Sequence, residues 1–171
     1  MNTLVVGLGN TLLGDEGVGV HIVNVLKDQP LPPSVVLKDG GVSGFDILPD
    51  ILESDRVVII DAAKMGLVPG SVRSFTLDNV QMPDGPEFSL HDLGLPQVLK
   101  LGSVISSLPP MLLIGIEPKK IAPGASLSEE VTGQMENILE YVYSAILDYT
   151  KEVVNRRRYL LLMMTPIWSR R

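Results

Sequence analysis

The stretch GLGNTLLGDEGVGV, from Gly7 to Val20, places the tightest limits on how this chain can fold. It follows a short apolar run, residues 3–6, and leads into apolar residues at helical spacing, which together predict a strand, a loop and a helix. In open α/β sheets, such loops lie at the carboxyl ends of strands, where ligands bind. Gly17 and Gly19 fall in the first turn of the expected helix, where each costs roughly 1 kcal/mol relative to alanine. We therefore expect this helix to pack its backbone closely against another element.

The spacing of the glycines disfavours a dinucleotide-binding loop. After Gly7 and Gly9, that motif requires a third glycine at position 12, which is occupied by Leu12. The acidic pair Asp15-Glu16 stands out instead, at the junction between loop and helix. A structural explanation is available, with Asp15 as the N-cap and Glu16 favoured by the helix dipole. The loop alone leaves this structural role and a functional role equally open.

Length and composition set the class of protein. A chain of 171 residues suits one domain, and its 45% apolar fraction is sufficient for a sizeable core. The net charge of −6 argues against general nucleic-acid binding. The absence of cysteine excludes disulfides, thiolate catalysis and cysteine metal sites. No signal peptide is evident, and no apolar run reaches the roughly 20 residues of a membrane span, so we expect a cytoplasmic protein.

Helix and strand patterns alternate along the rest of the chain. The first helix is expected from about residue 16 to 27. The further expected strands are 34–37, 56–60, 71–77 and 111–116, and the further expected helices are 44–52, 95–106 and a long helix that opens with capping-box spacing at Ser126. The strand at 71–77 alternates in polarity, so we expect it to be antiparallel or at an edge. The alternation predicts a three-layer α/β/α sandwich with a twisted, mostly parallel central sheet.

Residues 156–171 differ in composition from the rest of the chain. Five arginines give this segment a charge of +5, so the remainder carries −6 − 5 = −11. Between the arginines lies the apolar run 159–164. We assign residues 1–155 to the domain and 156–171 to a basic, apolar C-terminal extension. The extension is expected to continue the final helix and pack its apolar side on the body, with a mobile tail or a partner-binding segment as the second interpretation.

Three chemically useful side chains are expected to converge at one edge of the sheet. Glu16 follows the first strand, Asp61 ends the clearest buried strand, and His91 begins the helix after a long loop. The carboxyl ends of parallel strands gather at one edge. Two carboxylates and one imidazole suit borderline divalent ions and leave coordination positions for water or substrate. The second histidine, His21, falls within the first helix, and we expect it to be structural.

Five separated motifs occur in an order that resembles the hydrogenase maturation endopeptidases, which trim a carboxy-terminal extension from the large subunit of nickel–iron hydrogenases. The motifs are GLGNTLLGDEGVGV, Asp39-Gly40-Gly41, VVIIDAA, SLHDLGL and Gly115-Ile116-Glu117-Pro118, and the match covers roughly residues 3 to 150. The resemblance implies that Glu16, Asp61 and His91 occupy the metal-contacting positions of that family. Asp39 is an additional candidate, and its alternative role is a turn-forming aspartate before two glycines.

The resemblance further implies an endopeptidase, of an aspartic or metal-recognising type, whose partner is a hydrogenase large-subunit precursor already loaded with nickel. On this interpretation Glu16, Asp61 and His91 are both the catalytic and the metal-contacting residues. The nickel is carried by the substrate, or is bound as a divalent ion at the site. The three residues do not hold a permanent catalytic zinc. The nickel would position the scissile peptide and polarise its carbonyl or activate a water. The identity of the general base is left open.

Two alternatives remain on sequence grounds. The first is a metal-dependent hydrolase of a small substrate on the same architecture, and a metal site already formed in the purified protein would favour it. The second is a non-catalytic nucleotide- or metal-binding accessory module, and tight nucleotide binding without peptide cleavage would favour that.

Overall fold

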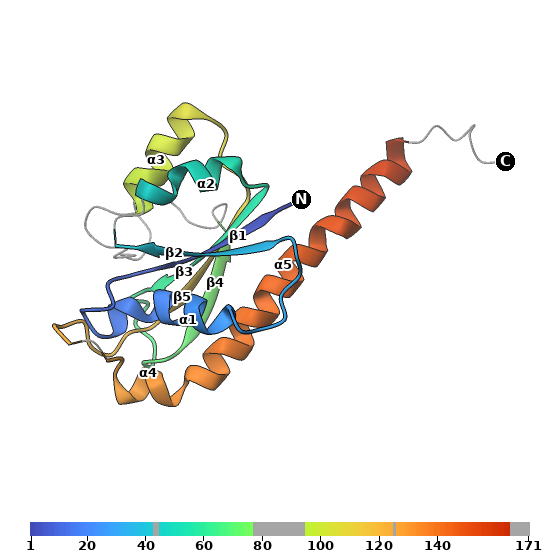
Figure 1. Ribbon diagram of the computed structural model, residues 1–171. Helices are drawn as coiled ribbons and strands as arrows, with labels where there is room; N and C mark the ends of the chain where they lie inside the picture. The colour runs from blue at the N-terminus through green and yellow to red at the C-terminus, as the bar shows by residue number, and fades with distance from the viewer. Residues whose placement is uncertain (43–44, 77–94, 125, 165–171) are drawn as a thin grey trace.

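The computed structural model describes residues 1–42, 45–76, 95–124 and 126–164, with the backbone alone at residues 45, 95–98, 101 and 152–164. In these ranges five strands form one sheet in the order β2-β1-β3-β5-β4 (Figure 1). The strands are β1 (Thr3–Leu8), β2 (Val35–Gly41), β3 (Arg56–Ala62), β4 (Val72–Thr76) and β5 (Met111–Ile116). Four of them are parallel, whereas β4 lies at an edge and runs antiparallel to β5, as its alternating sequence predicts.

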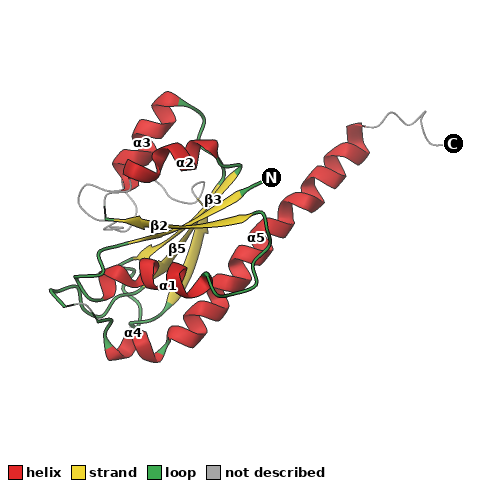
Figure 2. Cartoon of the chain, viewed as in Figure 1, coloured by secondary structure: helices red, strands yellow, loops and turns green. Residues whose placement is uncertain are grey.

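Helices cover both faces of this sheet (Figure 2). One face carries α1 (Val18–Leu26), α4 (Glu129–Gly133) and α5 (Met135–Met164), and the other carries α2 (Leu48–Glu53) and α3 (Leu95–Ile105). Two 3-10 turns, η1 (Asp15–Gly17) and η2 (Phe45–Ile47), precede α1 and α2. The predicted three-layer α/β/α architecture with a mostly parallel sheet is therefore confirmed.

A separate apolar cluster fills the space on each side of the sheet. The cluster beneath α1 and α5 includes Val5, Ile22, Ile60 and Ile146. The cluster beneath α2 and α3 includes Val6, Ile51, Ile59 and Leu99. Neighbouring residues of β1 and of β3 contribute to opposite clusters because successive side chains of a strand point to opposite faces. Burial on both faces explains why these strands are continuous apolar runs in the sequence.

Two expected helix starts differ from the observed ones. The segment expected as a short helix over 44–52, kinked or split at Pro49, is a 3-10 turn followed by α2, and the break lies before Leu48. Pro49 falls in the first turn of α2, where no helical hydrogen bond is lost. The C-terminal helix opens at Ser128 rather than Ser126, because the Ser128 hydroxyl accepts the Val131 amide at 3.3 Å. It is also divided at Gln134, which lies between α4 and α5.

The helix α1 meets the sheet through its backbone. A Cβ on Gly19 would lie 2.2 Å from the Ile60 carbonyl oxygen, and one on Gly7 would lie 2.1 Å from the Gly19 carbonyl oxygen. A Cβ on Gly17 would lie 2.6 Å from the Thr11 Cα. Only glycine allows these backbones to approach so closely. The tight packing expected from the two glycines at the start of the helix is thus confirmed.

The helix α5 contacts the body of the protein at Tyr149. There the Arg56 guanidinium donates to the Tyr149 carbonyl oxygen at 2.6 Å and lies 4.9 Å from the centre of the Tyr149 ring. Beyond this point the helix continues to Met164 and extends away from the sheet (Figure 1). A 30-residue helix is about 45 Å long, about twice the length of the longest strands, so its end extends beyond the core.

The basic segment therefore continues the final helix as far as Met164, as expected, but its backbone does not lie along the body, contrary to the expected packing. The helix is continuous across residue 155, and the division into 1–155 and 156–171 stays a prediction. In the described part of the chain, we find no helix with the length and apolar character needed to cross a membrane.

We expect the substitution Gly19→Ala to lower the free energy of unfolding by about 2 kcal/mol or more, because the added methyl group collides with the backbone of β3. Urea denaturation measures this change. The matched control is Gly133→Ala in α4, where an added Cβ meets nothing within 4 Å. This control is expected to be neutral or stabilising by up to about 1 kcal/mol. Equal effects of the two substitutions would contradict the account of the α1 contact.

We also predict that deletion of residues 156–171 leaves the domain folded, because all the strands and the part of α5 that covers the sheet precede this segment. The truncated protein is expected to unfold cooperatively in dilute solution, with a melting temperature within a few degrees of the full chain. Circular dichroism against temperature tests this prediction. A large drop in melting temperature would show that the segment is part of the core.

Candidate active site

The loop after β1 fixes Glu16 at the carboxyl edge of the sheet. Gly9 has φ +127°, a backbone conformation that residues other than glycine rarely adopt. A Cβ at Gly9 would lie 1.8 Å from the Glu16 carbonyl oxygen, so the turn η1 folds directly over the end of β1. The η1 turn also packs against β3. This backbone contact is what holds Glu16 near the end of β3.

The neighbouring acid, Asp15, is a structural anchor. Its carboxylate is fully buried and accepts the amides of Lys119 and Lys120, both at 2.9 Å, and the amide and hydroxyl of Ser128 at 2.6 and 2.8 Å. Burial by itself would raise the pKa of Asp15, but these hydrogen bonds outweigh it and lower the pKa. The N-cap of η1 is Gly14, so Asp15 does not have the N-cap role that was one of its two interpretations. Asp15 instead joins the first loop to the segment before α4.

Glu16 and Asp61 form the centre of the site. Their exposed fractions are 5% and 4%, and Asp61 lies at the carboxyl end of β3. Burial is the main cause that raises the pKa of Asp61 from 3.8 to about 7, and the negative charge of Glu16 raises it further. The Ala62 amide, which donates to Asp61 Oδ1 at 2.8 Å, acts in the opposite direction and lowers the pKa. The two carboxylates expected to converge are thus close enough to interact electrostatically. Asp61 is half protonated near neutral pH.

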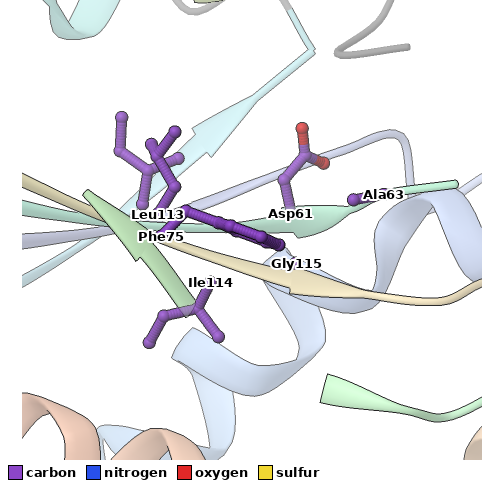
Figure 3. A pocket seen from close by; sticks show the side chains of 7 residues that line it. Asp61, Ala63, Phe75, Leu113, Ile114 and Gly115 are labelled. Atoms are coloured by element: carbon purple, nitrogen blue, oxygen red, sulfur yellow. The ribbon is translucent and has the colours of Figure 1, made fainter. Parts of the chain in front are cut away.

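The surroundings of Asp61 are apolar. A small cavity of about 20 Å³ adjoins it, lined otherwise by Ile59, Ala63, Phe75, Leu113, Ile114 and Gly115. The side chains of Asp61 and Leu113 project from the same face of the sheet, and Ile114 projects from the other (Figure 3). Such a lining offers little polar solvation to a carboxylate, which is the physical cause of the raised pKa of Asp61.

Glu117 stabilises the segment that follows Asp61. This residue is 7% exposed and lies just after β5, whose Gly115 pairs with Asp61. Its carboxylate accepts the amide of Met65 at 2.7 Å and that of Leu67 at 3.1 Å. From the sequence, Glu117 was recognised only as part of the motif Gly115-Ile116-Glu117-Pro118. No local pattern shows that it and Asp15 both hold segments from distant parts of the chain.

The remaining sequence candidates fall in different places. His91 lies outside the described residues. Within the described ranges, no three acidic or histidine side chains gather in a group that could hold a metal ion. Asp39 is exposed, and its Oδ1 accepts the Gly41 amide at 2.9 Å, so it has the turn-forming role that was its alternative. His21 lies in α1 and is half-buried, in agreement with a structural role.

Proteins of known name are similar to this chain in sequence, and a solved structure is similar to it in fold. The hydrogenase 2 maturation protease of Escherichia coli (strain K12) is 33% identical over 159 residues, which cover 91% of this chain and 97% of that protein. The hydrogenase expression/formation protein HoxM of Azotobacter vinelandii is 36% identical over 142 residues, covering 81% of this chain and 69% of that protein. The solved structure of the hydrogenase maturating endopeptidase HybD from E. coli superposes with a TM-score of 0.76 at 33% identity, over 87% of this chain and 94% of that one.

The sequence profile of the HycI family, described as hydrogenase maturation protease, matches residues 20–145. This match covers most of the chain and includes β3 with Asp61 and β5 with the segment that ends in Glu117. The sequence relatives and the solved structure indicate the same group of proteins. This chain belongs to the hydrogenase maturation protease family.

Proposed function

We propose that this protein is an endopeptidase that removes the C-terminal extension of a nickel-loaded nickel–iron hydrogenase large-subunit precursor. Family membership supports the proposal, and the observation that carries it is the buried pair of carboxylates, Glu16 and Asp61, at the carboxyl edge of the sheet. We place the reaction in the cytoplasm, in agreement with the expectation from the sequence. We assign the enzyme to an aspartic, metal-recognising type. Its catalytic groups include the carboxylate of Asp61, and the carboxylates of Glu16 and Asp61 recognise the nickel.

The electrostatics of the pair suit a divalent cation. Two buried carboxylates near each other are unfavourable when both are ionised, and the charge of Glu16 contributes to the raised pKa of Asp61 for this reason. A divalent cation between them reverses this cost, because it favours the ionised form of both groups. Carboxylate oxygens and one imidazole are suitable ligands for a borderline ion such as Ni²⁺. On the resemblance, His91 supplies the imidazole.

In the proposed reaction the nickel belongs to the substrate. Glu16, Asp61 and His91 bind the nickel of the precursor and thereby bring the scissile peptide to the edge of the sheet. As the nickel docks, Asp61 releases its proton to solvent, which its pKa of about 7 makes inexpensive at neutral pH. The bound metal polarises the scissile carbonyl or activates a water molecule for attack. The precursor thus carries the feature that selects it for cleavage.

We expect Glu16→Gln and Asp61→Asn each to lower the cleavage rate at least about 100-fold, because each keeps the shape of the side chain but removes its charge. His91→Ala is expected to weaken nickel or cadmium binding with the fold intact. Mass spectrometry of a nickel-loaded precursor incubated with each variant measures cleavage.

The controls for this experiment are His21→Ala and Glu53→Gln, both of which should cleave normally. Glu53 is an exposed acid at the end of α2, close in sequence to the start of β3, so it lies at the opposite edge of the sheet from Asp61. Full cleavage by Asp61→Asn would show that this carboxylate is only structural. Cleavage of a small substrate but not of the precursor would favour a metal-dependent hydrolase instead.

The raised pKa of Asp61 also predicts how stability depends on pH. The folded state holds the Asp61 proton up to about pH 7, whereas the unfolded chain releases it near 3.8, so folding loses stability as the pH rises between these values. We expect Asp61→Asn to remove this loss. The free energy of unfolding of Asp61→Asn minus that of the wild type should therefore be about 1–4 kcal/mol larger at pH 8 than at pH 4. Urea denaturation at the two pH values measures the difference.

Divalent ions extend the same test. Cd²⁺ should raise the melting temperature of the wild type more at pH 8 than at pH 6, because the metal competes with the proton on Asp61. Asp61→Asn should lose this response, and Glu53→Gln should keep both the response and the stability profile of the wild type. A pH-independent stability difference between Asp61→Asn and the wild type would contradict the assigned pKa.

A further inference from the structure

We propose that two copies of this chain associate through antiparallel pairing of their α5 helices, so that the basic end of each helix lies in the groove between α1 and α5 of the other copy. This surface lies away from the carboxylate pair, and the pairing does not depend on the proposed function. A groove, a projecting helix end and the opposite charges of the two favour this pairing.

The groove lies where α5 passes along α1 on the surface of the domain. Its volume is about 320 Å³. The lining combines apolar side chains, Val25, Leu139 and Tyr143, with two carboxylates, Glu136 and Glu140. Val25 is 42% exposed and both glutamates are exposed, so this surface is open to solvent in the single chain. An apolar groove with acidic side chains is suited to a basic segment that also has an apolar side.

The last part of α5 has this composition. The helix residues 135–155 contain four acids and one lysine, whereas residues 156–164 contain three arginines followed by the run Tyr-Leu-Leu-Leu-Met-Met. The backbone of this end extends away from the sheet (Figure 1). The helix is therefore acidic in its first part and basic at its end. Antiparallel pairing of two such helices places opposite charges against each other in both halves.

The spacing of residues along α5 supports this register. The groove residues Leu139 and Tyr143 belong to one helical stripe. At steps of three and four, the same stripe continues through Leu147, Thr150, Val154, Arg157, Leu161 and Met164. If the two-fold axis passes near Thr150, each residue of one helix lies level with the residue of the other copy's helix whose number brings the sum to about 300. Leu161 then lies opposite Leu139, and Val154 lies opposite Leu147.

The charged residues fit the same register. In this register Arg157 is level with Tyr143 of the other copy, and Glu140 lies three positions, about one helical turn, from Tyr143. The pairing is isologous, since each copy supplies one groove and one helix end, and it therefore closes at two copies.

A second copy is the occupant that the geometry favours. The chain cannot fill its own groove, because residues 140 and 160 lie about 30 Å apart along one continuous helix. An anionic membrane is the other surface that a basic, apolar segment could bind. The remainder of the chain carries −11, which opposes approach to such a membrane, and a single short segment anchors weakly. The same negative charge favours binding of the +5 segment of another copy.

The test uses the full chain and two charge-reversed variants. One variant carries Arg156→Glu, Arg157→Glu and Arg158→Glu, and the other carries Glu136→Arg and Glu140→Arg. Sedimentation equilibrium over a concentration series measures the mass, which should approach 2 × 18.5 kDa for the wild type. Each variant alone should self-associate at least about tenfold more weakly, since like charges then meet in both halves of the pair.

Mixing the two variants provides the decisive result. An equimolar mixture should recover association. In one contact the acidic helix end of the first variant meets the basic groove of the second, and in the other contact the basic helix end of the second variant meets the acidic groove of the first. Circular dichroism of each variant checks that it is folded. A wild-type protein that stays at 18.5 kDa at every concentration would overturn the proposal, as would a mixture that does not associate. A monomer that instead sediments with phosphatidylserine vesicles would identify the segment as membrane-binding and would also overturn it.

Discussion

The close contact between the backbone of α1 and the ends of β1 and β3 is the constraint on which the site depends. Gly19 lies directly against the Ile60 carbonyl, and Gly9 lies against the Glu16 carbonyl, so no side chain separates the first loop from the sheet. This approach brings the turn η1 next to the end of β3, where Asp61 follows Ile60 in sequence. A methyl group at either glycine would displace Glu16 from the neighbourhood of Asp61. The glycines therefore serve the geometry of the carboxylate pair as much as the packing of the domain.

Three of the four buried acids in the described part of this edge, Asp15, Glu117 and Asp61, have different surroundings. Asp15 accepts four hydrogen bonds, and Glu117 accepts two amides, each from segments far away in the chain. Asp61 accepts the amide of its own neighbour, Ala62, and lies in an apolar setting near the charge of Glu16. Asp15 and Glu117 are thus structural anchors, whereas Asp61 is held in a setting that disfavours its own charge. Strongly perturbed carboxyls of this kind are typical of functional sites, and a divalent cation bound beside Asp61 would favour its ionised form.

The sequence predicted the layers, the order of elements and the place of Asp61, because apolar periodicity and glycine spacing are local signals. It also predicted that Glu16 and Asp61 converge, since parallel strand ends share one edge. It did not predict the role of Asp15, because an acid before a helix normally indicates an N-cap and its actual partners are more than 100 positions away. The path of α5 beyond Tyr149 was also missed, since composition alone cannot show that a helix outruns the core. The prediction for His91 lies outside the described residues.

The central claim is that Glu16 and Asp61 bind one divalent ion together, and a crystal structure of the protein with Cd²⁺ tests it most directly. Anomalous scattering locates the ion without reference to the protein atoms. The account predicts a single strong peak at the carboxyl edge of the sheet, bonded to carboxylate oxygens of both Glu16 and Asp61 and to a nitrogen of His91. A peak bonded to neither carboxylate, or an ion held by surface acids alone, would contradict the account.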